Sequence, residues 1–330
     1  YKRQLMAYGQ EKKFALYSVA FYNMENLFDT IHDEGKNDYE YLPNGTNQWN
    51  TMKYKAKLKN MSEILSMLST DKLPMGPAII GVSEIENYRV LEDILKQPAL
   101  ADRGYQYVHY EGADQRGVDC AFFYNPKLFE LTNSKLVPYV YINDTVHKTR
   151  GFLIASGNIA GEKMHFIVNH WPSRAAASPA RERAGEQVRA IKDSLLREDS
   201  AAKIVIMGDM NDDPMDKSMA VALGAKRKPA DVGPTDLYNP WWDTLKKGYG
   251  TLMYKGKWNL FDQIVFTGNL LGTDRSTLKF YKHEIFRRDF MFQKEGKYKG
   301  YPKRTQAGGV WLNGYSDHLP TIIYLIKEVK

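Results

Sequence analysis

Residues 204–211 read Ile-Val-Ile-Met-Gly-Asp-Met-Asn, an apolar run that ends in two polar side chains, Asp209 and Asn211. The run has the length and the β-branched content of a buried strand. Because Asp209 and Asn211 stand two positions apart, their side chains project from the same side of an extended chain. A carboxylate and an amide aimed together can hold a metal ion, a water molecule or a phosphate oxygen. The competing interpretation is an Asx-rich turn closed by Pro214.

Upstream of this stretch, two more apolar runs end in polar side chains. Residues 80–87 read Ile-Gly-Val-Ser-Glu-Ile-Glu-Asn, and Asn23 ends the first apolar run of the chain. A carboxylate such as Glu84 suits Mg²⁺, which prefers oxygen ligands and takes only one or two protein carboxylates. Taken alone, Glu84 or Glu86 could equally cap the next helix, and Asn23 could simply form a turn.

Two histidines also follow or precede apolar runs. His170 leaves the run Phe-Ile-Val-Asn, whereas His318 belongs to the sequence Ser-Asp-His-Leu-Pro that includes Asp317. An imidazole titrates near neutral pH, so it can transfer protons or stabilise developing negative charge. Asp262, at the start of another run, could orient such an imidazole. A lone histidine is more often structural, but an adjacent Asp-His pair in this setting is less expected by chance.

Basic side chains supply candidate phosphate contacts. Arg174 and Arg181 could grip phosphate bidentately, although they could equally be surface charge. Residues 281–304 contain eight Lys or Arg, three acids and six aromatics. Such a mixture could follow a phosphate backbone and stack on bases, or bind a lipid headgroup or sugar phosphate, or be a solvated loop. Residues 29–48 are expected to form another long loop near the site.

Short β-rich runs recur from Phe14 to the end of the chain, and a few helical stretches lie between them. We expect strands at 14–22, 78–82, 105–110, 119–124, 152–159, 165–169, 203–207, 263–266 and 321–326. The periodicity predicts helices at 54–68 and from an N-cap at Ser178 to about residue 196. This pattern predicts an α+β fold of two packed mixed β-sheets flanked by helices, a four-layer α/β/β/α sandwich. We expect residues 1–13 to be flexible and residues 14–330 to form a single catalytic domain.

The bulk composition narrows the class of protein. Lys and Arg exceed Asp and Glu by 46 − 39 = 7, a weak attraction for phosphate-bearing partners. The one cysteine, Cys120, excludes an intrachain disulfide and is expected to be a buried strand residue. No stretch has the roughly 20 apolar residues of a membrane span, and we expect a monomer. Residues 5–10 resemble the end of an export signal, which slightly favours a secreted or periplasmic protein; that point stays open.

Taken together, these segments resemble the endonuclease/exonuclease/phosphatase superfamily, the group of deoxyribonuclease I, abasic-site exonucleases, neutral sphingomyelinases and inositol-polyphosphate phosphatases. The resemblance covers residues 14–326, and all the segments stand in family order. It implies Glu84, Asn23 and Asp317 as metal-site residues and Mg²⁺, or alternatively Mn²⁺, as the cofactor. The catalytic residues that it implies are His170, His318, Asp262, Asp209 and Asn211. His170 stands where abasic-site enzymes usually place a tyrosine, which favours the two-histidine branch.

The implied reaction is metal-dependent hydrolysis of a phosphodiester. Such a reaction needs charge stabilisation on phosphate oxygens, an aligned water and a protonated leaving group. The sequence favours a nuclease of deoxyribonuclease I type acting on nucleic acid. One alternative is a phosphatase or phosphodiesterase acting on lipid, inositol or other small phosphorylated substrates, and another is an inactive binding module on the same scaffold. Glu86 and Asp119 are the candidates for a carboxylate that orients His170.

Overall fold

The structure of the chain, a computed structural model, describes residues 12–142, 144 and 146–329. The expectation of a flexible segment at residues 1–13, and the resemblance of residues 5–10 to an export signal, fall mainly outside the described residues. Within them, the first strand begins at Lys13 rather than at Phe14. No helix in the described part of the chain is both long and apolar enough to cross a membrane.

Two large sheets form the centre of the molecule. The first has the strand order β14–β17–β1–β2–β4–β3, with bounds Lys279–Ile285, Thr321–Val329, Lys13–Leu27, Ile79–Ile85, Asp119–Tyr124 and Gln106–His109. The second has the order β5–β6–β7–β8–β13–β10–β9, with bounds Phe129–Val137, Phe152–Ile159, Glu162–His170, Lys203–Asp209, Asp262–Thr267, Leu237–Tyr238 and Ala225–Lys226. Both sheets are mixed. In the first sheet β1 and β2 run parallel, and in the second sheet β7 and β8, and also β9 and β10, run parallel. The other neighbouring strands of the two sheets are antiparallel.

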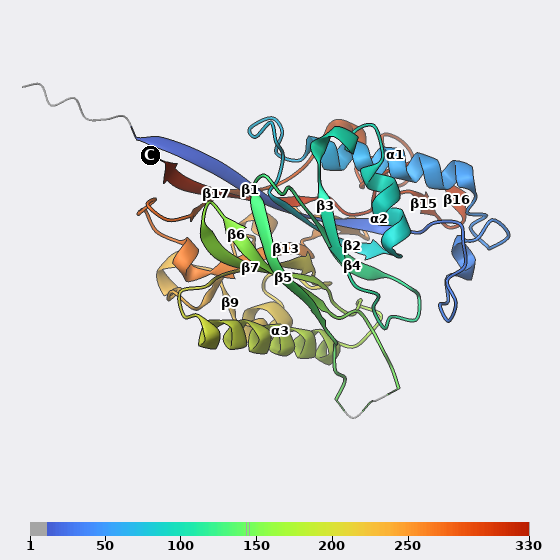
Figure 1. Cartoon of the computed structure of the whole chain (residues 1–330). Helices are drawn as coiled ribbons and strands as arrows, with labels where there is room; N and C mark the ends of the chain where they lie inside the picture. Colours follow the sequence, from blue (N-terminus) through green and yellow to red (C-terminus); the bar gives the residue numbers. More distant parts are fainter. Residues whose placement is uncertain (1–11, 143, 145, 330) are drawn as a thin grey trace, which may run out of the picture.

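Helices cover the outer face of each sheet (Figure 1). α1 (Thr51–Met67) and α2 (Tyr88–Leu95) lie against the first sheet, and α3 (Ser178–Glu198) lies against the second. The chain is completed by α4 (Trp242–Lys246), by a π-helical turn at Ser218–Leu223 and by two small hairpins, β11–β12 (Leu252–Tyr254, Lys257–Asn259) and β15–β16 (Gln306–Ala307, Val310–Trp311). This arrangement confirms the predicted four-layer α/β/β/α sandwich.

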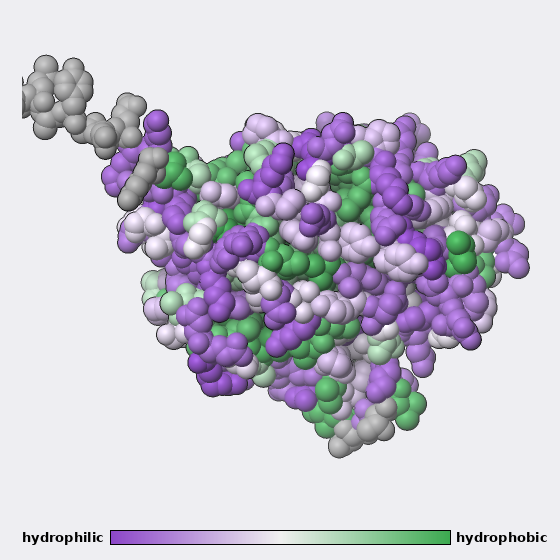
Figure 2. Space-filling model, in the orientation of Figure 1, coloured by the Kyte–Doolittle hydropathy of each residue, from purple (hydrophilic) through white to green (hydrophobic). Residues whose placement is uncertain are grey.

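The alternation of side chains along β1 explains the layers. Val19 and Phe21 point into the apolar core between the two sheets, whereas Ala20 and Tyr22 point into the core under α1. A strand that is apolar on both faces needs cover on both sides, because buried apolar area is the main source of stability. Cys120 lies in β4 and is buried, as predicted. The face of the molecule in Figure 2 is mainly hydrophilic, and its hydrophobic side chains lie in separate areas.

The helix boundaries differ from prediction where capping decides them. Helix α3 begins with Ser178, so Ala177 rather than Ser178 is the N-cap. At α2, the N-cap is Asn87, whose side chain accepts hydrogen bonds from the amides of Arg89 and Val90. The capping role considered for Glu84 or Glu86 therefore belongs to Asn87, which leaves Glu84 available for other contacts.

His283 on β14 makes the stability of the fold sensitive to acid. Burial, with a smaller effect of Lys247, lowers the pKa of His283 from 6.5 to about 4. Between these pH values the unfolded chain binds a proton that the folded chain does not, so the free energy of unfolding falls as the pH drops. Between about pH 7 and pH 4.5, we expect the free energy of unfolding to fall by about 2 kcal/mol more in the unaltered protein than in His283→Gln, because glutamine does not titrate. Urea unfolding at both pH values measures this difference. An unchanged pH dependence in the variant would contradict this assignment.

Candidate active site

Strand register brings the predicted residues of the second sheet together. Asp209, at the end of β8, is the register partner of His170 on β7 and of Asp262 on β13. In the first sheet, Asn23 of β1 pairs with Ser83 of β2, and Glu84 follows. Because parallel strands end at the same edge of a sheet, each sheet delivers its polar residues to a common edge of the sandwich.

Asp209 is the centre of the cluster. Asn23 donates from Nδ2 to Asp209 Oδ2 at 3.0 Å and to Glu84 Oε1 at 3.2 Å. His170 Nε2 lies 3.7 Å from both of these carboxylate oxygens. Potential metal-ligand atoms of Glu84, His170 and Asp209 lie within 4.8 Å of one another, and so do those of Asp209, Asp262 and His318. The two groups share Asp209, so the structure gathers the other four side chains around one carboxylate.

His318 forms a buried pair with Asp262. His318 Nδ1 lies 2.7 Å from Asp262 Oδ2, and its Nε2 faces the cluster, 3.8 Å from Asp209 Oδ2. Burial alone would lower the pKa of His318, but Asp262 and Asp209 together hold it well above its usual value. An imidazole fixed by a carboxylate in this way is oriented and favoured in its charged form.

Burial is the main cause of the pKa shifts of Asp209 and His170. Burial first, then the negative charges of Asp262 and Glu84, raise the pKa of Asp209 to about 7 against the lowering effect of His318. Burial, followed by Arg150, Arg116 and His318, holds the pKa of His170 well below its usual value.

This donor set fits a divalent cation. Glu84 and Asp209 offer two carboxylates, the number that Mg²⁺ usually takes from a protein, and Mn²⁺ also accepts oxygen ligands, whereas Asp262 is engaged by His318. A bound cation would favour the charged form of Asp209, whose pKa is raised by burial first and by neighbouring carboxylates second. Glu84 keeps a left-handed backbone with φ of 59°, which is costly for a residue with a Cβ and aims its carboxylate at the cluster.

The two asparagines serve the cluster differently from simple ligands. Asn23 Oδ1 accepts from the amide of Glu25 at 2.8 Å, so its NH₂ group, not its oxygen, faces the carboxylates. Asn211, at φ of 51°, donates from Nδ2 to the carbonyl of Trp171 at 3.0 Å. Its amide donates to Asp209 Oδ1 at 2.9 Å, which fixes the second oxygen of the central carboxylate.

Asp317 stands at the edge of the cluster. Its Oδ1 lies 3.9 Å from His318 Nε2, while its Oδ2 lies 3.0 Å from Nη2 of Arg304. Asp317 therefore connects the histidine to a neighbouring cationic group rather than to the central carboxylate.

The two arginines predicted to bind substrate are engaged with protein groups. Arg174 contacts the carbonyl of Asn211 at 3.1 Å and Oδ2 of Asp216 at 2.9 Å. Arg181 is buried, with Nε 2.9 Å from Oδ1 of Asp212 and Nη1 donating to two carbonyls of the preceding turn. These contacts fold the segment after β7. Both arginines are close to His170 in the sequence, but these contacts direct their guanidinium groups to other protein oxygens and not to the Asp209 cluster.

Neither carboxylate considered as a partner of His170 reaches it. Glu86 accepts a hydrogen bond from the amide of Asp29, and Asp119 lies 3.1 Å from Nε2 of His109. His170 Nδ1 has no hydrogen-bond partner within the described residues. The orienting role considered for Glu86 and Asp119 is therefore corrected: the carboxylates beside His170 are those of Glu84 and Asp209, each 3.7 Å from its Nε2.

Sequence reasoning missed a second charged network beside the cluster. Arg304 Nε donates to Glu25 Oε1 at 2.8 Å, and the amide of Thr305 donates to Glu25 Oε2 at 2.7 Å. Fully buried Lys57 lies 3.9 Å from the same carboxylate and donates to the carbonyl of Tyr315 at 2.7 Å. A lysine among the apolar positions of α1 was the available signal, because a buried lysine needs a partner.

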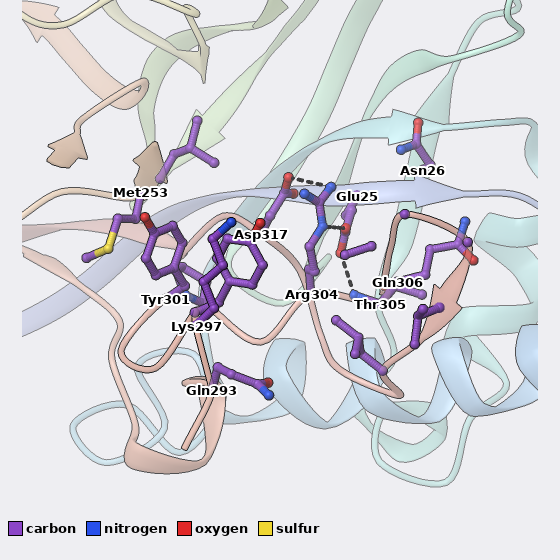
Figure 3. A pocket seen from close by; sticks show the side chains of 18 of the residues that line it. Glu25, Asn26, Met253, Gln293, Lys297, Tyr301, Arg304, Thr305, Gln306 and Asp317 are labelled. Carbon is purple, nitrogen blue, oxygen red and sulfur yellow. Dashed lines mark hydrogen bonds and ion pairs between the residues drawn. The ribbon is translucent and has the colours of Figure 1, made fainter. Parts of the chain in front are cut away.

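A cleft adjoins this network, as Figure 3 shows with Arg304 between Glu25 and Asp317. Its volume is about 1030 Å³, and its walls come from the end of β1, the 40–49 loop, the β11–β12 hairpin and residues 293–312. The predicted long loop at residues 29–48 thus does lie beside the site. In the basic segment 281–304, Arg287 packs 4.9 Å from the ring centre of Trp258 and Arg288 packs 4.1 Å from that of Phe286.

Carboxylates and imidazoles gathered at the strand ends of such a sandwich can supply the cation site and the proton-transfer groups that phosphoester hydrolysis uses. The chain belongs to the endonuclease/exonuclease/phosphatase family, whose sequence model matches residues 18–327, and so to the hydrolases that act on phosphoester bonds. This assignment confirms the resemblance inferred from the motifs. A search of curated proteins gave no match.

Solved structures share the fold at low sequence identity. An endonuclease/exonuclease/phosphatase family protein from Bacteroides thetaiotaomicron is 14% identical, with a TM-score of 0.58 over 97% of this chain and 98% of that one. A mannosyl-6-phosphatase from the same species is 14% identical, with a TM-score of 0.57 over 94% and 99%. D. rerio TDP2 complexed with a single-strand DNA product is 14% identical, with a TM-score of 0.54 over 94% and 99%. At such identities the likeness shows the fold alone.

Proposed function

We propose that this chain is a divalent-cation-dependent phosphoesterase whose reaction takes place at the Asp209 cluster. The observation that carries the proposal is the sharing of Asp209 between Glu84 and His170 on one side and Asp262 and His318 on the other. A hard divalent cation, when bound by the carboxylates, would supply Lewis-acid stabilisation of the phosphate charge. Mg²⁺ is the proposed ion and Mn²⁺ the alternative.

The protein groups would do the remaining work. In the reaction, a water oxygen bonds to phosphorus, the ester P–O bond breaks, and the alcohol leaves with a proton. His318, held by Asp262 with Nε2 toward the cluster, is placed to donate to a phosphate oxygen or to the leaving oxygen. His170, with Nε2 between Glu84 and Asp209, is placed to contact the attacking water. Asn23 and Asn211 orient the central carboxylate.

Two classes of substrate remain candidates. The nuclease interpretation is favoured by exposed Lys294, Lys297 and Lys299 in the basic segment. Its support is weaker than the composition of residues 281–304 indicates, because Arg287 and Arg288 pack on aromatic rings of the protein. A small phosphorylated substrate is favoured by the compact cleft beside Asp317. The solved structures with this fold include both a mannosyl-6-phosphatase and a protein bound to a DNA product.

A substrate panel tests the proposal. Plasmid DNA, RNA, sphingomyelin, inositol phosphates and hexose phosphates would be incubated with the protein and Mg²⁺ or Mn²⁺. The products measured would be released phosphate, phosphocholine from sphingomyelin, or cleaved polymer. We expect cation-dependent hydrolysis of at least one class. Steep inhibition by salt would mark a nucleic-acid substrate, because phosphate-backbone contacts release counterions. A folded protein that hydrolyses none of the esters would contradict the proposal.

A further inference from the structure

The cleft is connected directly to the candidate active site. Asp317 lines the cleft, and its Oδ1 lies 3.9 Å from His318 Nε2. Asn26 also lines it and donates its amide to Glu84 Oε2 at 2.8 Å. Leu252, on the opposite wall, pairs with His318 by a β-bridge. A phosphate held at the cluster would therefore have its ester group at the mouth of the cleft.

The size of the cleft indicates more than a phosphate site. A volume of about 1030 Å³ is at the upper end of the range for small-molecule sites, roughly 300–1,000 Å³. A phosphate group alone would leave most of it filled with water. The cleft is large enough for the organic part of a substrate with one or more rings.

Its charges argue against a polyanion. Four carboxylates and three cationic groups line it: Glu25, Glu40, Glu295, Asp317, Lys255, Lys297 and Arg304. Among the cationic groups, the guanidinium of Arg304 is already paired with Glu25 and Asp317. A nucleic-acid backbone along this lining would meet as much negative as positive charge, which opposes its binding. An uncharged organic group would meet no such repulsion.

The remaining lining offers flat rings and amides. Tyr254 and Tyr298 expose 62% and 52% of their surface and line the cleft together with Tyr301. The side-chain amides of Asn47 and Gln293 also line it. In Figure 3, Tyr301 and Lys297 lie beside each other on the loop wall facing Arg304. Tyrosine rings pack on the apolar faces of a ring and their hydroxyls accept or donate hydrogen bonds. Amides offer both donors and acceptors to hydroxyl groups.

We propose that this cleft binds the uncharged, polyhydroxylated ring of a phosphate ester, a carbohydrate or a cyclitol, and directs its phosphate to the Asp209 cluster. The proposal rests on the proposed function and names its substrate class. Tyr254 and Tyr298 supply ring contacts.

The test compares a ring substrate with a minimal one. Hydrolysis of hexose 6-phosphates and of myo-inositol 1-phosphate would be measured beside that of methyl phosphate, which carries no ring. We expect the double variant Tyr254→Ala/Tyr298→Ala to lower kcat/KM for the ring substrates by about tenfold or more, mainly through KM, because two aromatic contacts are lost. Hydrolysis of methyl phosphate should change less than about twofold, a difference of roughly 0.4 kcal/mol.

Tyr281→Ala is the matched control. Tyr281 is 50% exposed and, like Tyr254, lies beside a cationic side chain, but it belongs to β14 and does not line the cleft. A short oligonucleotide serves as the comparison substrate. A preference for the oligonucleotide over the hexose and inositol phosphates, or an equal effect of the double variant on methyl phosphate, would overturn the cleft assignment. Loss of hydrolysis of every ester by the unaltered protein would instead refute the phosphoesterase proposal itself.

Discussion

Replacement of His318 by asparagine is expected to lower kcat by about 10²- to 10⁴-fold, the usual contribution of a positioned proton-transfer group. Asparagine cannot carry the positive charge that Asp262 and Asp209 favour on this imidazole. It would also leave Asp262 buried with one partner fewer. The measurement is steady-state hydrolysis of the best ester from the panel, with folding checked by thermal unfolding. A folded variant with more than a tenth of the original kcat would refute the role of His318.

His165→Asn is the matched control for this experiment. His165 is a buried histidine on β7, the strand that carries His170, and its Nδ1 lies 2.6 Å from the hydroxyl of Ser156. It belongs to neither of the two groups around Asp209. The control therefore loses a buried imidazole without touching the cluster, and its kcat should stay near that of the unaltered protein.

Removal of the cation is expected to abolish hydrolysis, and Glu84→Gln is expected to reduce it by at least about 100-fold at a fixed low concentration of Mg²⁺ or Mn²⁺. Glutamine keeps the size of Glu84 and its hydrogen bond from Asn26 but lacks the negative charge that a cation requires. Activity would be measured after chelation and after re-addition of each ion, and cation binding by calorimetry. Undiminished hydrolysis after rigorous chelation would count against the cation site.

Glu86→Gln is the matched control for Glu84→Gln, because it replaces a buried glutamate that is not proposed to bind the cation. Glu86 stands two residues after Glu84, and burial, aided by Asp29, raises its pKa to about 9. It is therefore largely protonated at neutral pH, and glutamine resembles its neutral form. We expect this variant to bind the cation and to hydrolyse the ester within about twofold of the unaltered protein.

Periodicity and strand-end motifs were sufficient to predict the main layers and the central cluster. The runs at 119–124 and 152–159 match β4 and β6 in full, because each contains at least four consecutive apolar residues. Strand β5 was missed because polar residues at 130 and 132–135 interrupt its apolar positions. The short edge strands β9 and β10 hold only two residues each, too few for any periodicity.

The parts of the site that escaped prediction depend on distant partners. Arg304 and Glu25 are separated by 279 positions and Lys57 and Thr305 by 248, so no local pattern connects them. Conversely, Arg174 and Arg181 were predicted from their nearness to His170 in the sequence. In the structure, three aspartates in the segment after β8 contact these guanidinium groups.

The beginning of strand β1 lies far from the candidate active site. Lys13 pairs with Val329 at one end of β1, whereas Asn23 reaches the cluster ten residues later, roughly 33 Å away at the rise of an extended strand. Figure 1 shows this end of β1 beside β17, clear of the helices. A reporter protein or an immobilising tag joined ahead of residue 12 would consequently leave the reaction centre open to substrate, even on a solid support.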